Sequence, residues 1–340
     1  MDKMILSKND LSKLIEELLK KNKVYGPVKS DDTVLFEEIK KPTELYLDYL
    51  NSEVPPKALM LHQTETLFKF IPGPKGKIEP VDMDEKKVIF GIRPCDAKSF
   101  AILDHVFEGD FDDPYFITKR KNTILIGLSC STPGTNCFCT SFDDSPAASK
   151  YVDILLTDIG NNYYVEVISD LGKQVTKAAG KLFKSATESD TKKKKDAEKK
   201  AIDMISRTQK TDKIVEKLDK IFENRFWKDV AFKCLGCGTC TYLCPTCHCF
   251  DIQDESTLTK GARIRVWDNC MNPEYTIHAS GYNPRPARAN RVRNRIYHKY
   301  NYYPKNFDVI ACVGCGRCID LCPVNIDIID VVTKAGEVKP

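Results

Sequence analysis

The chain has 340 residues, of which 42% are hydrophobic and 29% are charged. This length is enough for two or three domains, and the composition excludes a disordered or fibrous protein. The formal net charge of +4 is too small to indicate a nucleic-acid-binding protein by itself. The sequence shows neither an apolar run of about 18 residues nor a secretory signal after Met1, so we expect no membrane span and no export.

Leucines at helical spacing between residues 11 and 19 predict a short amphipathic helix, with Asn9 and Asp10 as candidate caps. Runs rich in β-branched residues predict strands at 33–39, 88–92, 124–128 and 163–168. Residues 97–107 predict a helix that follows the second of these strands. We therefore expect residues 1–171 to form a mixed α/β domain.

Residues 172–229 are rich in lysine and predict a solvated helical connector, with a flexible middle near residues 185–191. A docking patch for an acidic partner is the alternative interpretation. Helical periodicity returns at Ile214, Leu218, Ile221 and Phe222.

The 15 cysteines are the most informative feature of the sequence. Their odd number fits poorly with complete disulfide pairing, and a chain without an export signal is expected in the reducing cytoplasm. Clustered cysteines in that compartment are more often metal ligands or catalytic groups than disulfides. We therefore expect a cytoplasmic protein whose thiolates bind metal.

Eight of these cysteines form two runs of the pattern C-x2-C-x2-C-x3-C-P, one starting at Cys234 and the other at Cys312. In such runs three thiolates hold one [4Fe-4S] cluster and the fourth reaches the other cluster of a pair. The spacing predicts cluster A on Cys234, Cys237, Cys240 and Cys322, and cluster B on Cys312, Cys315, Cys318 and Cys244. Gly236, Gly238, Gly314 and Gly316 fit a backbone that curls around the clusters.

Zinc is the competing metal, but zinc sites usually pair two short C-x2–4-C elements, unlike these triple runs. The 67 residues between Cys244 and Cys312 are too many for a minimal two-cluster ferredoxin. They predict a mostly α-helical, ferredoxin-like dicluster domain at residues 230–340, and the whole chain is then of the α+β class.

A basic stripe lies within that intervening segment. It comprises Arg285, Arg288, Arg291, Arg293, Arg295, His298 and Lys299. The stripe could balance the charge of the clusters, dock an acidic protein partner or bind nucleic acid. We prefer the first interpretation, because no nucleic-acid-binding motif accompanies the stripe.

Four cysteines in the first half of the chain predict a third [4Fe-4S] cluster. Cys95 and Cys130 follow predicted strands, and Cys137 and Cys139 lie in the next loop. Strand ends and a loop can converge at one edge of a sheet, where four thiolates would complete a cluster. Unliganded buried thiols and a zinc ion are the alternatives.

Cys247, Cys249 and Cys270 remain. Packing of their sulfur atoms around cluster B is the simpler interpretation. The other is that they ligate a metal with a fourth group, for which His248, Asp268 and His278 are candidates in the sequence.

The chain resembles the 4Fe-4S dicluster family that includes the beta subunit of soluble hydrogenase/sulfur reductase and the A subunit of anaerobic sulfite reductase. The resemblance runs from about residue 24 to 331, and the Lys-rich segment 173–213 lies outside it. It rests on Arg93-Pro-Cys95-Asp96, Cys137-Phe-Cys139, the two cysteine runs, Cys244-Pro-Thr-Cys247-His-Cys249 and Trp267-Asp-Asn-Cys270.

The resemblance implies an oxygen-sensitive electron-transfer subunit without catalytic residues of its own. Its electrons would come from a flavin subunit that carries FAD and a [2Fe-2S] cluster and oxidises NAD(P)H. They would pass to a catalytic subunit of the hydrogenase, sulfite reductase or heterodisulfide reductase type. The sequence itself contains no G-x-G-x-x-G fingerprint near Gly91, so we expect no flavin in this chain.

Two other functions stay open at this point. The spare thiols Cys247, Cys249 and Cys270 could reduce a disulfide or a sulfur species. A zinc-bearing module could use the basic stripe to bind nucleic acid.

Overall fold

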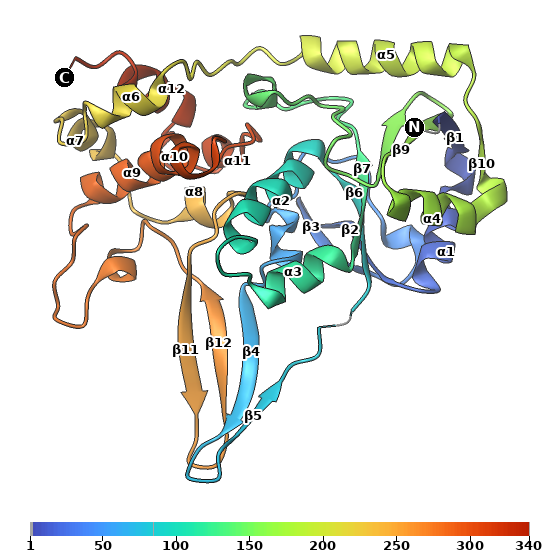
Figure 1. Cartoon of the computed structure of the whole chain (residues 1–340). Helices are drawn as coiled ribbons and strands as arrows, with labels where there is room; N and C mark the ends of the chain where they lie inside the picture. The colour runs from blue at the N-terminus through green and yellow to red at the C-terminus, as the bar shows by residue number, and fades with distance from the viewer. Residues whose placement is uncertain (1–2, 84, 340) are drawn as a thin grey trace. The chain divides into compact units, whose positions relative to one another are not determined.

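The computed structural model describes residues 3–83 and 85–339, which divide into two units (Figure 1). The first unit comprises Met1–Pro56, Met83–Arg207 and Val313–Cys315, and the second comprises Lys57–Asp82, Thr208–Cys312 and Gly316–Pro340. Each unit thus contains segments that are far apart in the sequence. The predicted domain limits at 171/172 and 229/230 stay a prediction.

The described residues of the first unit form an eight-stranded sheet in the order β10-β1-β9-β8-β7-β6-β2-β3. Strands β2, β6, β7 and β8 run parallel, and the strands toward both edges are antiparallel to their neighbours. The strands are β1 (Lys3–Ser7), β2 (Lys23–Ser30), β3 (Thr33–Ile39), β6 (Lys87–Ile92), β7 (Thr123–Leu128), β8 (Ile154–Asp158), β9 (Asn162–Val167) and β10 (Phe183–Ser185).

Helices cover both faces of this sheet. Alternate strand residues such as Val88, Phe90 and Ile126 pack with Leu14 and Val175 into one core, which is covered by α1 (Leu11–Leu19) and α4 (Asp170–Ala179). Against β7, β8 and β9 also lie α2 (Pro94–Phe107), paired with α3 (Pro114–Lys121), and α5 (Glu188–Asp203). This arrangement confirms the predicted mixed α/β fold.

The local predictions in this unit are confirmed to within a few residues, but the flexible middle of the Lys-rich segment is wrong. Residues 183–185 form β10, which pairs with β1 at the edge of the sheet. Thr187 caps α5, since its hydroxyl accepts a hydrogen bond from the Asp190 N–H while the Asp190 carboxylate accepts one from the Thr187 N–H. Sheet pairing and this capping box order a segment whose composition suggested flexibility.

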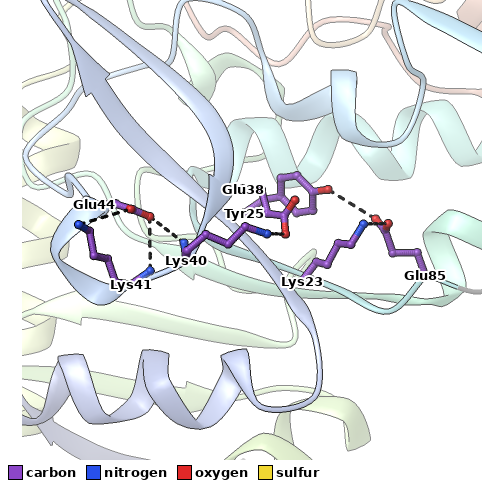
Figure 2. A network of polar contacts seen from close by, with 7 residues as sticks. All are labelled: Lys23, Tyr25, Glu38, Lys40, Lys41, Glu44 and Glu85. Atoms are coloured by element: carbon purple, nitrogen blue, oxygen red, sulfur yellow. Dashed lines mark hydrogen bonds and ion pairs between the residues drawn. The ribbon is translucent and has the colours of Figure 1, made fainter.

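Polar contacts join β2 to the segment that precedes β6 and order the turn that follows β3 (Figure 2). Glu85 pairs with Lys23 and accepts a hydrogen bond from the Tyr25 hydroxyl at 3.5 Å. Glu44 accepts hydrogen bonds from the backbone N–H groups of Lys40 and Lys41. Contacts of this kind at the protein surface contribute little individually to stability.

The second unit contains an antiparallel sheet that the sequence patterns did not predict. Its order is β11-β12-β4-β5, with β4 (Thr64–Ile71), β5 (Lys77–Pro80), β11 (Phe250–Ser256) and β12 (Gly261–Trp267). Arg265 on β12 is almost fully buried and pairs with Glu65 on β4 at 2.5 Å. This ion pair joins chain segments 200 residues apart.

Short helices make up the rest of the second unit, as predicted for a dicluster domain. They are α6 (Ile214–Asp219), α7 (Phe226–Ala231), α8 (Thr239–Tyr242), α9 (Arg288–Tyr297), α10 (Tyr303–Phe307), α11 (Arg317–Asp320) and α12 (Ile328–Ala335). Trp227 and Tyr297 pack edge to face in its aromatic core, with ring centroids 5.5 Å apart. Across the described part of the chain, no helix is long and apolar enough to cross a lipid bilayer.

Candidate iron–sulfur cluster sites

The two cysteine runs fold in the same way. Gly238 and Gly316 have φ angles of 78° and 81°, and each lies immediately before a four-residue helix, α8 or α11. A side chain would strain this left-handed backbone, so glycine is the favoured residue at both positions. The fourth cysteine of each run, Cys244 or Cys322, follows its helix directly. The repeated motif thus produces a repeated structure.

The four cysteines predicted for cluster A line one cavity of about 50 Å³ in the second unit. Apolar side chains complete much of the wall, and Arg295 and Cys318 also reach it. The apolar part of the lining includes Met271, Val292, Ile326 and Val331. Four convergent thiols in an apolar pocket fit a [4Fe-4S] cluster.

Backbone N–H groups already point at sulfur in this cavity. The Gly236 N–H donates to Cys234 Sγ at 3.3 Å, and the Ile326 N–H donates to Cys322 Sγ at 3.2 Å. Such hydrogen bonds stabilise the negative charge of cluster ligands. Cys237 is exposed, and a hydrogen bond with the Thr239 hydroxyl lowers the pKa of its thiol. Cluster A would therefore have one corner at the protein surface.

Three of the cysteines predicted for cluster B, Cys244, Cys312 and Cys318, lie in the second unit. Burial raises the pKa of Cys318 to about 12, and the nearby thiols of Cys244 and Cys312 act in the same direction. Burial thus disfavours the Cys318 thiolate, and the iron ions of a cluster would supply the positive charge that stabilises it. The fourth predicted ligand, Cys315, is buried and belongs to the short segment that packs with the first unit.

The four cysteines predicted for the third cluster all lie in the first unit, at the carboxyl ends of β6 and β7. Cys95 is the second residue of α2, Cys130 follows β7, and Cys139 begins a short 3-10 helix. Burial and the neighbouring thiols of Cys130 and Cys137 raise the pKa of Cys139. The structure thus brings three of these thiols within electrostatic reach of one another and places Cys95 at the adjacent strand end.

The loop that carries Cys137 and Cys139 packs closely against Gly314 and Cys315 of the second cysteine run. The Phe138 N–H donates to the Gly314 carbonyl at 2.8 Å, and the Asn51 side chain donates to the Cys315 carbonyl at 2.9 Å. A Cβ atom on Gly314 would lie only 2.5 Å from the Cys139 nitrogen. Gly314 is therefore required by this close approach as well as by its φ of 64°.

The basic stripe contacts the cysteine runs instead of pointing uniformly to solvent. Arg288 donates to the Cys234 carbonyl, and Arg295 donates to the Cys240 carbonyl at 3.1 Å. Arg293 stacks on Phe222 with its guanidinium 3.6 Å from the ring centroid. Lys299 reaches Cys244 itself. These contacts support the structural and charge-balancing interpretation of the stripe.

The three spare cysteines divide into two environments. Cys249 Sγ accepts hydrogen bonds from the Cys270 thiol and the Tyr275 hydroxyl, which lower the pKa of Cys249 to about 6. Cys247 instead donates to the neighbouring Cys244. Of the candidate fourth ligands, His248 packs edge to face against His298, and burial lowers the pKa of His248 to about 3.

Sequence reasoning missed Lys57, which is buried beside these thiols. Its ammonium donates to the Cys247 carbonyl at 2.8 Å and lies 4.5 Å from the centre of the Trp267 indole. Nothing in the sequence around Lys57 predicts these contacts, because they depend on the pairing of distant chain segments.

Within the described residues, no group of three or more His, Cys, Asp or Glu side chains is arranged to hold a single metal ion. A tetrahedral zinc site needs its ligands closely convergent, with Zn–S distances of about 2.3 Å.

Comparison with known proteins agrees with this geometry. Residues 233–326 match the 4Fe-4S dicluster domain family. The chain is also 36% identical over 316 residues to sulfhydrogenase 2 subunit beta of Pyrococcus furiosus, and the match covers 93% of this chain and 92% of the relative. The chain therefore belongs to the 4Fe-4S dicluster family of hydrogenase/sulfur reductase beta subunits, and it is an iron–sulfur electron-transfer subunit with two [4Fe-4S] clusters.

Proposed function

We propose that this chain relays single electrons between a flavin subunit that oxidises NAD(P)H and a terminal reductase or hydrogenase subunit. The observation that carries the proposal is the sequence of contacts between cysteine loops. The third-cluster loop packs on Gly314 and Cys315 of the second run, and Cys318 of that run lines the cavity of cluster A. Cys315 and Cys318 belong to the same run, so the chain itself links the third-cluster loop to the cavity of cluster A.

The ligand assignment follows from the two runs. Cys234, Cys237, Cys240 and Cys322 would hold cluster A, and Cys312, Cys315, Cys318 and Cys244 would hold cluster B. The shared cavity of the first four supports the crossed position of Cys322. Each cluster, when bound, supplies a site that accepts or donates one electron. The chain's own residues exclude water from the sites and donate N–H groups to sulfur.

A third cluster on Cys95, Cys130, Cys137 and Cys139 is part of the proposal. It is supported by the position of these residues at adjacent strand ends and by the burial of Cys95 and Cys139. Protein purified without oxygen should then contain about twelve iron atoms, four for each cluster. Cys95→Ala should remove about four of them. An unchanged iron content in this variant would contradict the third cluster.

The name of the Pyrococcus furiosus relative supports a hydrogenase-type catalytic partner. The flavin subunit with FAD and [2Fe-2S], and sulfite reductase or heterodisulfide reductase partners, come from the family resemblance alone. All 15 cysteines lie among the described residues and are free thiols, which fits a reducing cytoplasm.

The test is anaerobic co-purification from the native host, followed by electron transfer in the isolated complex. NADH or NADPH should reduce the clusters of this chain when the flavin subunit is present and should fail to do so when it is removed. Reduction of the isolated chain by NAD(P)H alone, or a complex without a flavin subunit, would contradict the relay.

A second candidate function is reduction of a disulfide or sulfur species by the spare thiols, and Cys249 favours it. Its hydrogen bonds from Cys270 and Tyr275 stabilise a nucleophilic thiolate. Oxidation of Cys249 and Cys270 to a disulfide would reduce one substrate S–S bond to two thiols, and two electrons from the clusters with two protons would restore the pair. The isolated chain with a reduced dye should then consume a disulfide, and Cys249→Ser should not.

A further inference from the structure

Lys299 is a buried cation in contact with sulfur. It lies on a π-helical turn, His298–Tyr302, that continues α9, and its side chain is almost fully inaccessible to solvent. Its ammonium donates to Cys244 Sγ at 3.2 Å, to the Thr246 hydroxyl at 2.7 Å and to the Ala311 carbonyl at 2.8 Å. An ammonium has three N–H donors, and these three contacts use all of them.

The positive charge of Lys299 has no carboxylate to balance it. Each of its hydrogen-bond acceptors in the described structure is a sulfur, a hydroxyl or a carbonyl. Burying an ammonium without a counter-charge is costly. The arrangement becomes favourable when the neighbouring sulfur belongs to an anionic cluster.

The predicted ligands of cluster A have no equivalent contact among the described residues. There, Cys234 and Cys322 accept hydrogen bonds from neutral backbone N–H groups. Arg288 and Arg295 donate to the backbone carbonyls of Cys234 and Cys240 and not to sulfur. The two sites therefore share a ligand pattern but differ by one charge in direct contact with a ligand.

We propose that Lys299 is a positioning residue that raises the reduction potential of cluster B above that of cluster A. This inference rests on the proposed assignment of Cys244 to cluster B. Reduction adds one electron to the cluster, and no bond forms or breaks. A fixed positive charge beside a ligand sulfur in a dry site stabilises the added electron. Electrons would then collect on cluster B when the pair is half reduced.

Helical spacing places Lys299 on the face that contacts the first cysteine run. Arg288, Arg295 and Lys299 are separated by seven and four residues, so they lie on one face of a continuous helix. Such turns occur mostly as single interruptions of α-helices, often at functional sites. Here the turn carries Lys299 in the position where its side chain meets Cys244.

The test compares three variants by redox titration monitored by electron paramagnetic resonance, with iron content measured in each. Lys299→Met removes the charge and the donors, and Lys299→Gln removes the charge but keeps an N–H donor. Lys305→Met is the control: it removes a charge from the adjacent helix α10, where Lys305 is exposed and pairs with Asp219 at 2.7 Å.

One reduction step should shift to lower potential in both Lys299 variants by at least tenfold in its equilibrium constant, which is about 59 mV for one electron. The other steps, and all steps of Lys305→Met, should stay in place. The inference is overturned if no step moves at full iron content, if all steps move together, or if both Lys299 variants lose about four iron atoms. A wild-type chain without clusters would instead contradict the proposed function.

Discussion

The two cysteine runs have the same ligand pattern but different surroundings. The first run lies wholly in the second unit, and its Cys237 is exposed. In the second run, Cys312 and Cys315 are buried, and Val313–Cys315 packs with the first unit against the loop of Cys137 and Cys139. A repeated motif thus determines which atoms bind iron, while the rest of the chain determines exposure and local charge.

Because their surroundings differ, we expect the two clusters to have different roles in electron transfer. An exposed corner suits electron exchange with a docked protein, because the transfer distance to a partner is then short. A buried cluster beside a fixed cation suits the interior of a path. Variants that change one run and not the other test whether the two clusters differ in this way.

The largest effect is expected for paired cysteine variants that test the crossed ligation. Cys322→Ser combined with Cys234→Ser should cost about four iron atoms, because both residues hold cluster A. Cys322→Ser combined with Cys312→Ser should cost about eight. The reverse result in anaerobic metal analysis, a loss of about eight iron atoms from the first double variant and about four from the second, would show that the fourth ligands do not cross between the runs.

The next effect concerns the glycine that joins the second run to the third-cluster loop. Gly314→Ala should lower the free energy of unfolding by about 1–3 kcal/mol more than Gly281→Ala. Both glycines have positive φ, so both variants carry a similar backbone strain of about 1–2 kcal/mol. Only Gly314 meets neighbouring backbone, whereas Gly281 faces open space.

Denaturant unfolding under anaerobic conditions measures this difference, and the iron content of each variant serves as a second readout. Equal destabilisation of the two variants would mean that Gly314 does not pack closely against the loop of Phe138 and Cys139.

A smaller effect is the order in which the clusters lose iron. Because Cys237 is exposed whereas Cys312 and Cys315 are buried, an iron chelator should remove cluster A several times faster than cluster B. The fast phase of iron release should be absent from Cys234→Ser, which lacks cluster A. If the fast phase persists in this variant, the cluster that loses iron first is not cluster A.

The last prediction is a pH dependence from the edge-to-face pair His248 and His298. Burial lowers their pKa values to about 3 and about 4, below the usual 6.5. Their contribution to stability is therefore complete above pH 6.5 and is lost as the pH falls toward 4, because the unfolded chain binds protons that the folded chain does not.

At pH 5 the loss is roughly 2 kcal/mol for each histidine, from about 1.4 kcal/mol per pH unit. Thermal unfolding between pH 7 and pH 5 measures it, and the double variant His248→Gln/His298→Gln should show a flatter profile. An identical profile in that variant would assign the acid sensitivity to other groups.

What the sequence predicted correctly depends on local spacing. The cysteine runs, the helix that begins at Leu11 and the strand Thr33–Ile39 each need only a few neighbouring residues to be recognised. The four-stranded sheet was missed because β4 pairs with β12, and no local signal links segments about 200 residues apart.

The environment of the clusters was less predictable than their ligands. Lys299 was noted only as part of a basic stripe, since its contact with Cys244 joins residues 55 apart in the sequence. Lys57 reaches Cys247 from the segment that leads into β4. The positions of such charged groups depend on tertiary structure, whereas candidate ligands can be recognised from the sequence motif.

The most direct test of the relay is quantitative spectroscopy of the anaerobically purified chain. After reduction by dithionite, iron analysis and paramagnetic resonance should report about twelve iron atoms and three interacting [4Fe-4S] centres. A folded, colourless preparation without an iron-based paramagnetic signal would contradict the account.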